Sequence, residues 1–153
     1  MLKGLDPVLT PDLLWVLAAM GHGDDLALVD ANHPAARIAR STASGRLVEL
    51  PGLSMARAAR AILSVLPLDD FTPDPIRRMQ VVGDPEAIPD VQKSVQAEID
   101  RVSGRPLAMA GIERFAFYEA AKAGFAVVQV GDPRGYGCFL FRKGVVFGEP
   151  QQI

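Results

Sequence analysis

Residues 21–32 read GHGDDLALVDAN, and the fold assignment depends on this stretch. Within it, residues 26–29 form a short apolar run that is followed directly by Asp30. A run of this kind is typical of a strand that is buried on both faces, as in a sheet covered by helices. We therefore expect a buried strand at 26–29, with His22 just before it and Asp30 at its carboxyl end.

The residues upstream predict a helix that ends just before His22. Thr10 can cap this helix, and Pro11 is tolerated in the first turn, where its missing N–H would have no partner. Gly21 is expected to end the helix by adopting the left-handed conformation. One apolar stripe follows the helical spacing i, i+3, i+4 and i+7, and it consists of Leu13, Val16, Leu17 and Met20.

Downstream, expected strands alternate with expected helices. The strands are expected at 46–50, 76–82, 125–130 and 138–142, the last followed by a hairpin turn at 143–144. The helices are expected at 54–66, 85–102 and 114–123. This alternation predicts a three-layer α/β/α fold with a mixed, mostly parallel sheet, and we expect a single domain over residues 1–153.

The composition indicates a globular chain and excludes several classes of protein. Of 153 residues, 49% are hydrophobic and 22% are charged, and no apolar run approaches the roughly 18 residues of a membrane span. The net charge of −2 does not favour nucleic acid or an anionic membrane as partner. One cysteine, Cys138, allows no intrachain disulfide, so a reducing cytoplasm is expected. The mean hydropathy of +0.17 favours some apolar contact between subunits.

Four places carry polar side chains that the fold alone does not require. They are His22 with the acids Asp24, Asp25 and Asp30, the pair Asp69-Asp70, the pair Arg114 and Tyr118, and the loop 136–138. Arg114 and Tyr118 are four residues apart and share one helix face. An imidazole between glycines can exchange protons in a cleft near neutral pH. A carboxylate at the end of a buried strand lies where α/β sheets usually bind ligands.

Each place also has an ordinary structural interpretation. The GHG turn can be a helix end with an exposed histidine, and Asp30 can cap a turn. Tyr118 can be a core residue, and Arg114 a surface charge. No metal site is predicted, because the chain has no CxxC or HxxxH pattern. The GxSxG elbow of hydrolases and the GxxxxGK[ST] loop of nucleotide-binding proteins are also missing from the sequence.

Five stretches, in the same order along residues 1–147, decide between these interpretations. They are LTPDLLWVLAAMGHGD, GHGDDLALVDANHPA, ILSVLPLD, RFAFYEAA, and YG followed by a strand and KGV. Together they resemble the RbsD/FucU-like family of fucose mutarotases and ribose pyranases. RFAFYE favours the fucose mutarotase branch.

The resemblance implies an isomerase that interconverts the anomers of a free monosaccharide, most simply L-fucose, without a metal or organic cofactor. Ring opening of the hemiacetal needs one proton delivered to the ring oxygen and one removed from the anomeric hydroxyl. The resemblance also implies a ring-shaped homo-oligomer, commonly a decamer, with sites near subunit contacts. No nucleic acid or membrane partner is expected.

The resemblance also assigns roles to individual residues. His22 matches the proton donor, and Asp69 and Tyr118 match further acid/base positions. The substrate-binding positions are matched by Asp30, Arg114, Tyr136, Gly137 and Cys138.

The chain departs from the family pattern at three positions. Cys138 replaces the asparagine of the family's Tyr-Gly-Asn triplet, and a thiol is a weaker donor and acceptor than an amide. The loss of one sugar hydrogen bond costs about 0.5–1.5 kcal/mol. His33 stands where the family often has an aromatic residue, and Asp70 adds a second acid that would raise one pKa if it shared a pocket with Asp69. Ribose pyranase activity, a non-catalytic sugar-binding or transport-accessory module and a purely structural oligomer remain alternatives.

Overall fold

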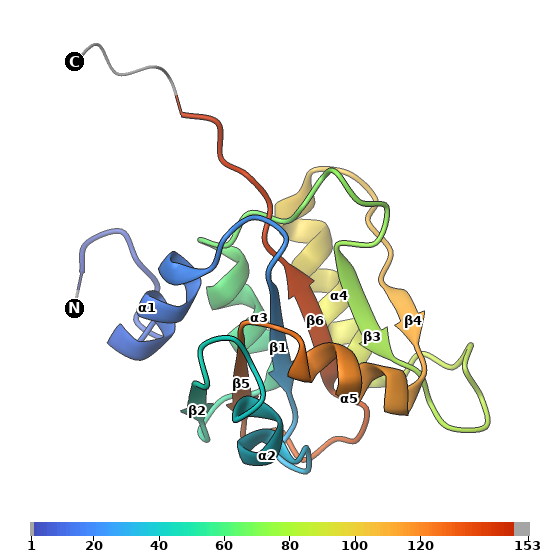
Figure 1. The fold of residues 1–153 in the computed structure, drawn as a ribbon. Helices are drawn as coiled ribbons and strands as arrows, with labels where there is room; N and C mark the ends of the chain where they lie inside the picture. The colour runs from blue at the N-terminus through green and yellow to red at the C-terminus, as the bar shows by residue number, and fades with distance from the viewer. Residues whose placement is uncertain (1, 149–153) are drawn as a thin grey trace.

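Strand β1 (Asp25–Val29) lies inside a six-stranded sheet of order β2-β5-β1-β6-β3-β4 in the computed structural model, which describes residues 2–148 (Figure 1). The other strands are β2 (Leu47–Leu50), β3 (Ile76–Met79), β4 (Ala110–Ile112), β5 (Ala126–Val130) and β6 (Cys138–Arg142). β1 pairs in parallel with β5 and antiparallel with β6, which also runs antiparallel to β3. The β2–β5 and β3–β4 pairs are parallel. The sheet is therefore mixed and mostly parallel, as the sequence predicts.

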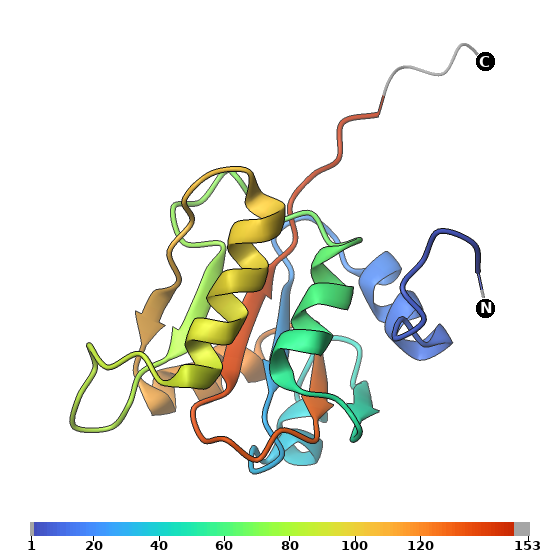
Figure 2. The same cartoon turned by 180° about the vertical axis from the view of Figure 1, so that it is seen from behind.

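Helices cover both faces of this sheet. The helices α1 (Pro11–Ala19), α3 (Met55–Leu63) and α4 (Asp90–Ser103) pack on one face, which Figure 2 shows from the front. The short α2 (Ala35–Ala39) and α5 (Arg114–Lys122) pack on the other face (Figure 1). Alternate residues of β1 supply the two cores: Leu26 and Leu28 face the first layer, and Ala27 and Val29 the second. This confirms the three-layer architecture.

Side-chain caps fix where several helices begin. The Thr10 hydroxyl accepts a hydrogen bond from the Leu13 N–H, and the Ser54 hydroxyl accepts one from the Arg57 N–H. In α5, the Glu113 carboxylate accepts from the N–H groups of the first turn. That cap orients the residues at the start of α5, where the site is built.

Some boundaries differ from the sequence expectation. α3 ends at Leu63, three residues before the expected end, β3 ends at Met79 rather than at residue 82, and α4 begins after Pro89 rather than at residue 85. Proline has no N–H to donate and is tolerated only before the helix or in its first turn, so Pro89 fits the start that the structure shows. α2 and β4 are absent from the expected elements because they are only five and three residues long.

The loop between α1 and β1 is held differently from the expectation. Gly23, with φ of 86°, takes the left-handed conformation that was expected for Gly21. The expected hairpin turn at 143–144 is wrong: no strand follows β6 in the described residues up to 148. Instead, the Lys143 ammonium donates to the carbonyls of Leu17 and Met20 at the end of α1, where the helix dipole favours a cation. Lys143 O also accepts from the Gly23 N–H, which anchors the loop that carries His22.

Candidate functional site

A small cavity of about 200 Å³ lies at the carboxyl end of β1. This volume is below the roughly 300–1,000 Å³ of pockets for drug-sized ligands, and suits a ligand of about one sugar ring. The cavity brings together five of the residues predicted from the sequence. Its lining consists of Asp30, Asn32, His33, Met79, Arg114, Tyr118, Gly135, Tyr136 and Cys138.

Asp30 is a buried residue of the cavity lining and directly follows β1. Its carboxylate accepts hydrogen bonds from the backbone N–H groups of Asn32 at 2.9 Å and Gly137 at 3.2 Å, and from the Cys138 thiol at 3.5 Å. Burial raises the pKa of Asp30, although these three donors act in the opposite direction. Asp30 therefore connects the 131–137 loop to the end of β1 through hydrogen bonds. Its carboxylate still has lone pairs that can accept a hydrogen bond from a ligand hydroxyl.

Arg114 and Tyr118 reach the cavity from the first turns of α5. The Arg114 Nε–H donates to the Tyr118 hydroxyl at 3.2 Å, as expected for residues four apart on one helix face. Phe115, between them in sequence, is 66% exposed and stacks edge-on against Tyr118.

Tyr136 is held in an uncommon backbone conformation. Its φ of 63° is left-handed, which costs a non-glycine residue about 1–2 kcal/mol. Space beside the neighbouring Gly137 is tight, because a Cβ there would lie 3.3 Å from the Asp30 Cβ and 3.2 Å from Val91 Cγ2. The Tyr136 hydroxyl accepts a hydrogen bond from the Val82 N–H. The Tyr-Gly pair is therefore shaped to approach Asp30 closely.

His33 lines the same cavity and was not among the predicted site residues. Its Nδ1 lies 3.5 Å from the Cys138 Sγ, and its Nε2 has no hydrogen-bond partner among the described residues. Since the Cys138 thiol donates to Asp30, we assign the Nδ1–H tautomer, which donates to the sulfur. Desolvation lowers the pKa of His33 to about 4, and burial raises the pKa of the Cys138 thiol. The sequence signal was its position three residues after Asp30.

Burial of neutral His33 predicts a specific loss of stability in acid. Its ordinary pKa of 6.5 falls to about 4 in the folded chain, so the unfolded chain takes up a proton first as the pH falls. Stability is thus fully present above pH 6.5 and is lost towards pH 4, by about 3 kcal/mol. The raised pKa of Asp30 acts in the opposite sense, because its buried carboxyl is more stable when protonated.

Urea unfolding of the wild type and of His33→Phe at pH 7 and pH 4.5 measures this contribution. Between the two pH values, the free energy of unfolding of the variant should fall by about 2–3 kcal/mol less than that of the wild type. Asp30 is present in both proteins, so its contribution to the pH dependence of stability cancels in this comparison to first order. If the free energy of unfolding falls equally with pH in the two proteins, a neutral buried His33 is ruled out as the source of the acid instability.

His22 and Asp69 form a separate pair at the opposite end of β1. The His22 Nε2 lies 3.1 Å from the Asp69 Oδ1, and the Phe71 ring contacts the imidazole in a tilted arrangement, with 5.3 Å between centroids. Burial alone would raise the pKa of Asp69, but the Phe71 N–H and His22 outweigh it and lower that pKa. At about 3.3 Å per residue, β1 separates this pair from Asp30 by roughly 20 Å. Figure 1 shows the two ends of β1 pointing to opposite edges of the molecule.

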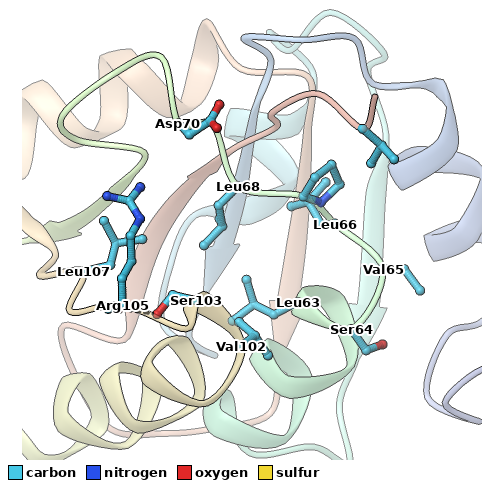
Figure 3. Close-up of a pocket in the computed structure, with 12 residues that line it drawn as sticks. Leu63, Ser64, Val65, Leu66, Leu68, Asp70, Val102, Ser103, Arg105 and Leu107 are labelled. Carbon is cyan, nitrogen blue, oxygen red and sulfur yellow. Dashed lines mark hydrogen bonds between the residues drawn. The ribbon is translucent and has the colours of Figure 1, made fainter. Parts of the chain in front are cut away.

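The other acids of the predicted groups do not join either set. Asp25 forms ion pairs with Arg77 and Arg142, and Asp24 accepts the Gly21 N–H. Asp70 lines a different and larger cavity of about 460 Å³ between the ends of α3 and α4. Figure 3 shows this cavity with mainly apolar side chains around it, and Asp70 and Arg105 as its charged residues. Asp70 therefore does not share a pocket with the sugar-binding candidates.

The described residues hold neither a cluster of metal ligands nor a membrane-spanning helix. No group of three or more His, Cys, Asp or Glu side chains in residues 2–148 is placed to hold a metal ion. No helix in that range is long and apolar enough to cross a membrane.

Comparison with known proteins places the chain in a family. The L-fucose mutarotase of Actinobacillus pleuropneumoniae (strain L20) is 37% identical, and the match covers 95% of this chain and 97% of that protein. The fucose mutarotase of Homo sapiens is 39% identical, with 97% of each covered. The crystal structure of the Streptococcus pneumoniae fucose mutarotase in complex with L-fucose superimposes with a TM-score of 0.85 at 31% identity, covering 95% of this chain and all of the other. The model of the RbsD / FucU transport protein family matches residues 3–146, so the chain belongs to the RbsD/FucU family.

Proposed function

We propose that this protein is a cofactor-free mutarotase that interconverts the anomers of a free monosaccharide, with L-fucose as the preferred substrate. The observation that carries the proposal is the convergence of a carboxylate, a guanidinium and two phenols on one cavity of about 200 Å³. These are the groups of Asp30, Arg114, Tyr118 and Tyr136. The full-length similarity to fucose mutarotases supports the choice of sugar.

The reaction needs two proton transfers on one sugar. An acid protonates the ring oxygen while a base removes the anomeric hydroxyl proton, and the C–O bond of the hemiacetal opens to the free aldehyde. Rotation about the bond to the carbonyl carbon exposes its other face, and closure reverses the two transfers. In our proposal, Asp30, Arg114 and Tyr136 orient the sugar hydroxyls. The protons are exchanged by Tyr118 and by His22, which is paired with Asp69. The Cys138 thiol is already committed to Asp30 and contributes shape rather than a hydrogen bond.

One chain cannot bring these groups together, so we infer that the site forms between two copies. His22 and Asp69 lie at one end of β1, and Asp30 and Tyr118 lie at the other. Each half also carries an exposed phenylalanine: Phe71 beside His22 and Phe115 beside Tyr118, both 66% exposed. Exposed aromatic rings next to functional polar groups are typical of interfaces.

The positions of the two halves also constrain the assembly. They lie at opposite ends of the same strand, so the contact joins unlike surfaces of neighbouring copies. A contact of unlike surfaces is heterologous, and it generates a ring when the rotation closes. We therefore propose a ring-shaped homo-oligomer, and the decamer of the family resemblance is the expected form. The buried free thiol of Cys138 agrees with a reducing compartment, and we place the reaction in the cytoplasm.

Magnetisation-transfer NMR on a panel of free sugars tests this function. The protein should speed exchange between the anomers of L-fucose far more than between those of D-galactose or D-ribose. Faster pyranose–furanose exchange of D-ribose would instead identify a ribose pyranase. Tight calorimetric binding of L-fucose with no faster exchange would identify a non-catalytic binding module, and neither binding nor exchange would leave a structural oligomer.

A further inference from the structure

The conformation of Tyr136 is held by a buried amide that lies outside the sugar cavity. Gln92, in the first turn of α4, is fully buried. Its Nε2 donates to the carbonyl of Tyr136 at 2.9 Å and to the carbonyl of Met79 at 2.8 Å. Both N–H groups of this amide are therefore used, and both hold backbone next to the site.

These bonds occur where two strands part. The pairing of β3 with β6 ends at Arg78 and Phe139, so Met79 and the residues before Cys138 no longer pair with each other. The Gln92 amide occupies this place and links the end of β3 to the loop that leads into β6. Met79, Tyr136 and Cys138 all line the cavity on the far side of this link.

Arg78 fixes which way the amide points. Its guanidinium is buried and donates to the Gln92 Oε1 at 3.3 Å, and to the carbonyls of Pro85 and Ala87. A flipped amide would set an NH₂ group against the guanidinium and an oxygen against two carbonyls. The orientation seen is therefore the one in which Gln92 donates to Tyr136.

We propose that Gln92, oriented by Arg78, is a positioning residue that holds Tyr136 in its left-handed conformation and so sets the shape of the sugar site. The expected effect of Gln92 on sugar kinetics rests on the proposed sugar function. Its effect on the conformation of Tyr136 rests on the geometry alone. Gln92 is not itself part of the cavity lining, so its effect passes through the backbone of Tyr136 and Met79, which are. Without the amide, Tyr136 relaxes and the hydroxyl-binding geometry is lost.

Fluorine NMR of protein labelled with 3-fluorotyrosine gives a readout that a general loss of packing would not. The chain has two tyrosines, and Tyr118→Phe assigns their resonances. In Gln92→Leu, the Tyr136 resonance should shift or broaden while that of Tyr118 stays in place. The half-saturating concentration of L-fucose in the exchange assay should rise about five- to ten-fold, as for one lost hydrogen bond, with a smaller change in the maximal rate.

Gln96 provides the matched control one turn further along α4. It also donates to a backbone carbonyl, that of Leu107, but that carbonyl is not part of the site. Gln96→Leu should leave both resonances and the half-saturating concentration unchanged. If Gln92→Leu does not fold, Gln92→Glu keeps the shape and the oxygen that faces Arg78 but cannot donate as a carboxylate.

An unchanged Tyr136 resonance in a folded Gln92 variant overturns the positioning role. So does a half-saturating concentration equal to that of the wild type. If the wild type does not speed anomer exchange, the proposed function fails, but the fluorine spectrum still decides the role of Gln92.

Discussion

Replacing His22 with alanine is expected to lower the rate of anomer exchange by at least about 100-fold. A positioned acid/base group contributes about 10²–10⁴ to a proton-transfer reaction. His22 is the imidazole best placed for that role, because its Nε2 is paired with the Asp69 carboxylate at 3.1 Å and its side chain is 48% exposed. The other histidine, His33, is buried and its pKa is about 4, so it is not available as an acid near neutral pH.

The variant should keep its fold and assembly, because a half-exposed loop side chain is removed. We expect the free energy of unfolding to change by less than about 0.5–1 kcal/mol, and size-exclusion chromatography to give the wild-type oligomer. Asp70→Asn is the matched control: it changes a neighbouring loop, yet Asp70 faces the other cavity, so exchange should remain at the wild-type rate. Exchange by His22→Ala within a few-fold of the wild type would remove His22 from the mechanism.

The sequence predicted the architecture well where a residue pattern has a single physical interpretation. The apolar runs of β1 and β5, the caps at Thr10 and Ser54, and the stripe on α4 all correspond to observed elements. The structure also shows a convergence of Asp30, Arg114, Tyr118 and Tyr136 on one cavity. Local patterns alone could not predict it, since these residues come from three separate segments that only the sheet order brings together.

Other features depend on contacts that leave no local signal. His22 and Asp69 are separated by 47 residues, and nothing in either segment indicates that their side chains pair. His33 looks like a turn residue until its contact with Cys138 is known. Gln92 interrupts no pattern, because its neighbours Val91 and Val95 already complete the apolar stripe. Long-range pairing of polar groups is thus the part that sequence reasoning missed.

The second large effect is a gain of activity when two inactive variants are mixed. In the proposed assembly, one copy supplies Asp30, Arg114 and Tyr118, and its neighbour supplies His22. His22→Ala leaves the cavity intact, while the double variant Arg114→Met, Tyr118→Phe leaves His22 intact. These two cavity side chains are hydrogen-bonded to each other at the surface of α5, so their replacement should not disturb the core.

In oligomers that contain the two chains in equal number and random order, half of the cavities are intact, and half of those face an intact His22. About one quarter of the wild-type sites should therefore be complete. The measurement is magnetisation transfer between the L-fucose anomers by oligomers purified through two different tags after co-expression. Exchange is expected at about a quarter of the wild-type rate, although each parent variant alone is nearly inactive. Mixed oligomers that stay as inactive as both parents would contradict a site shared between copies.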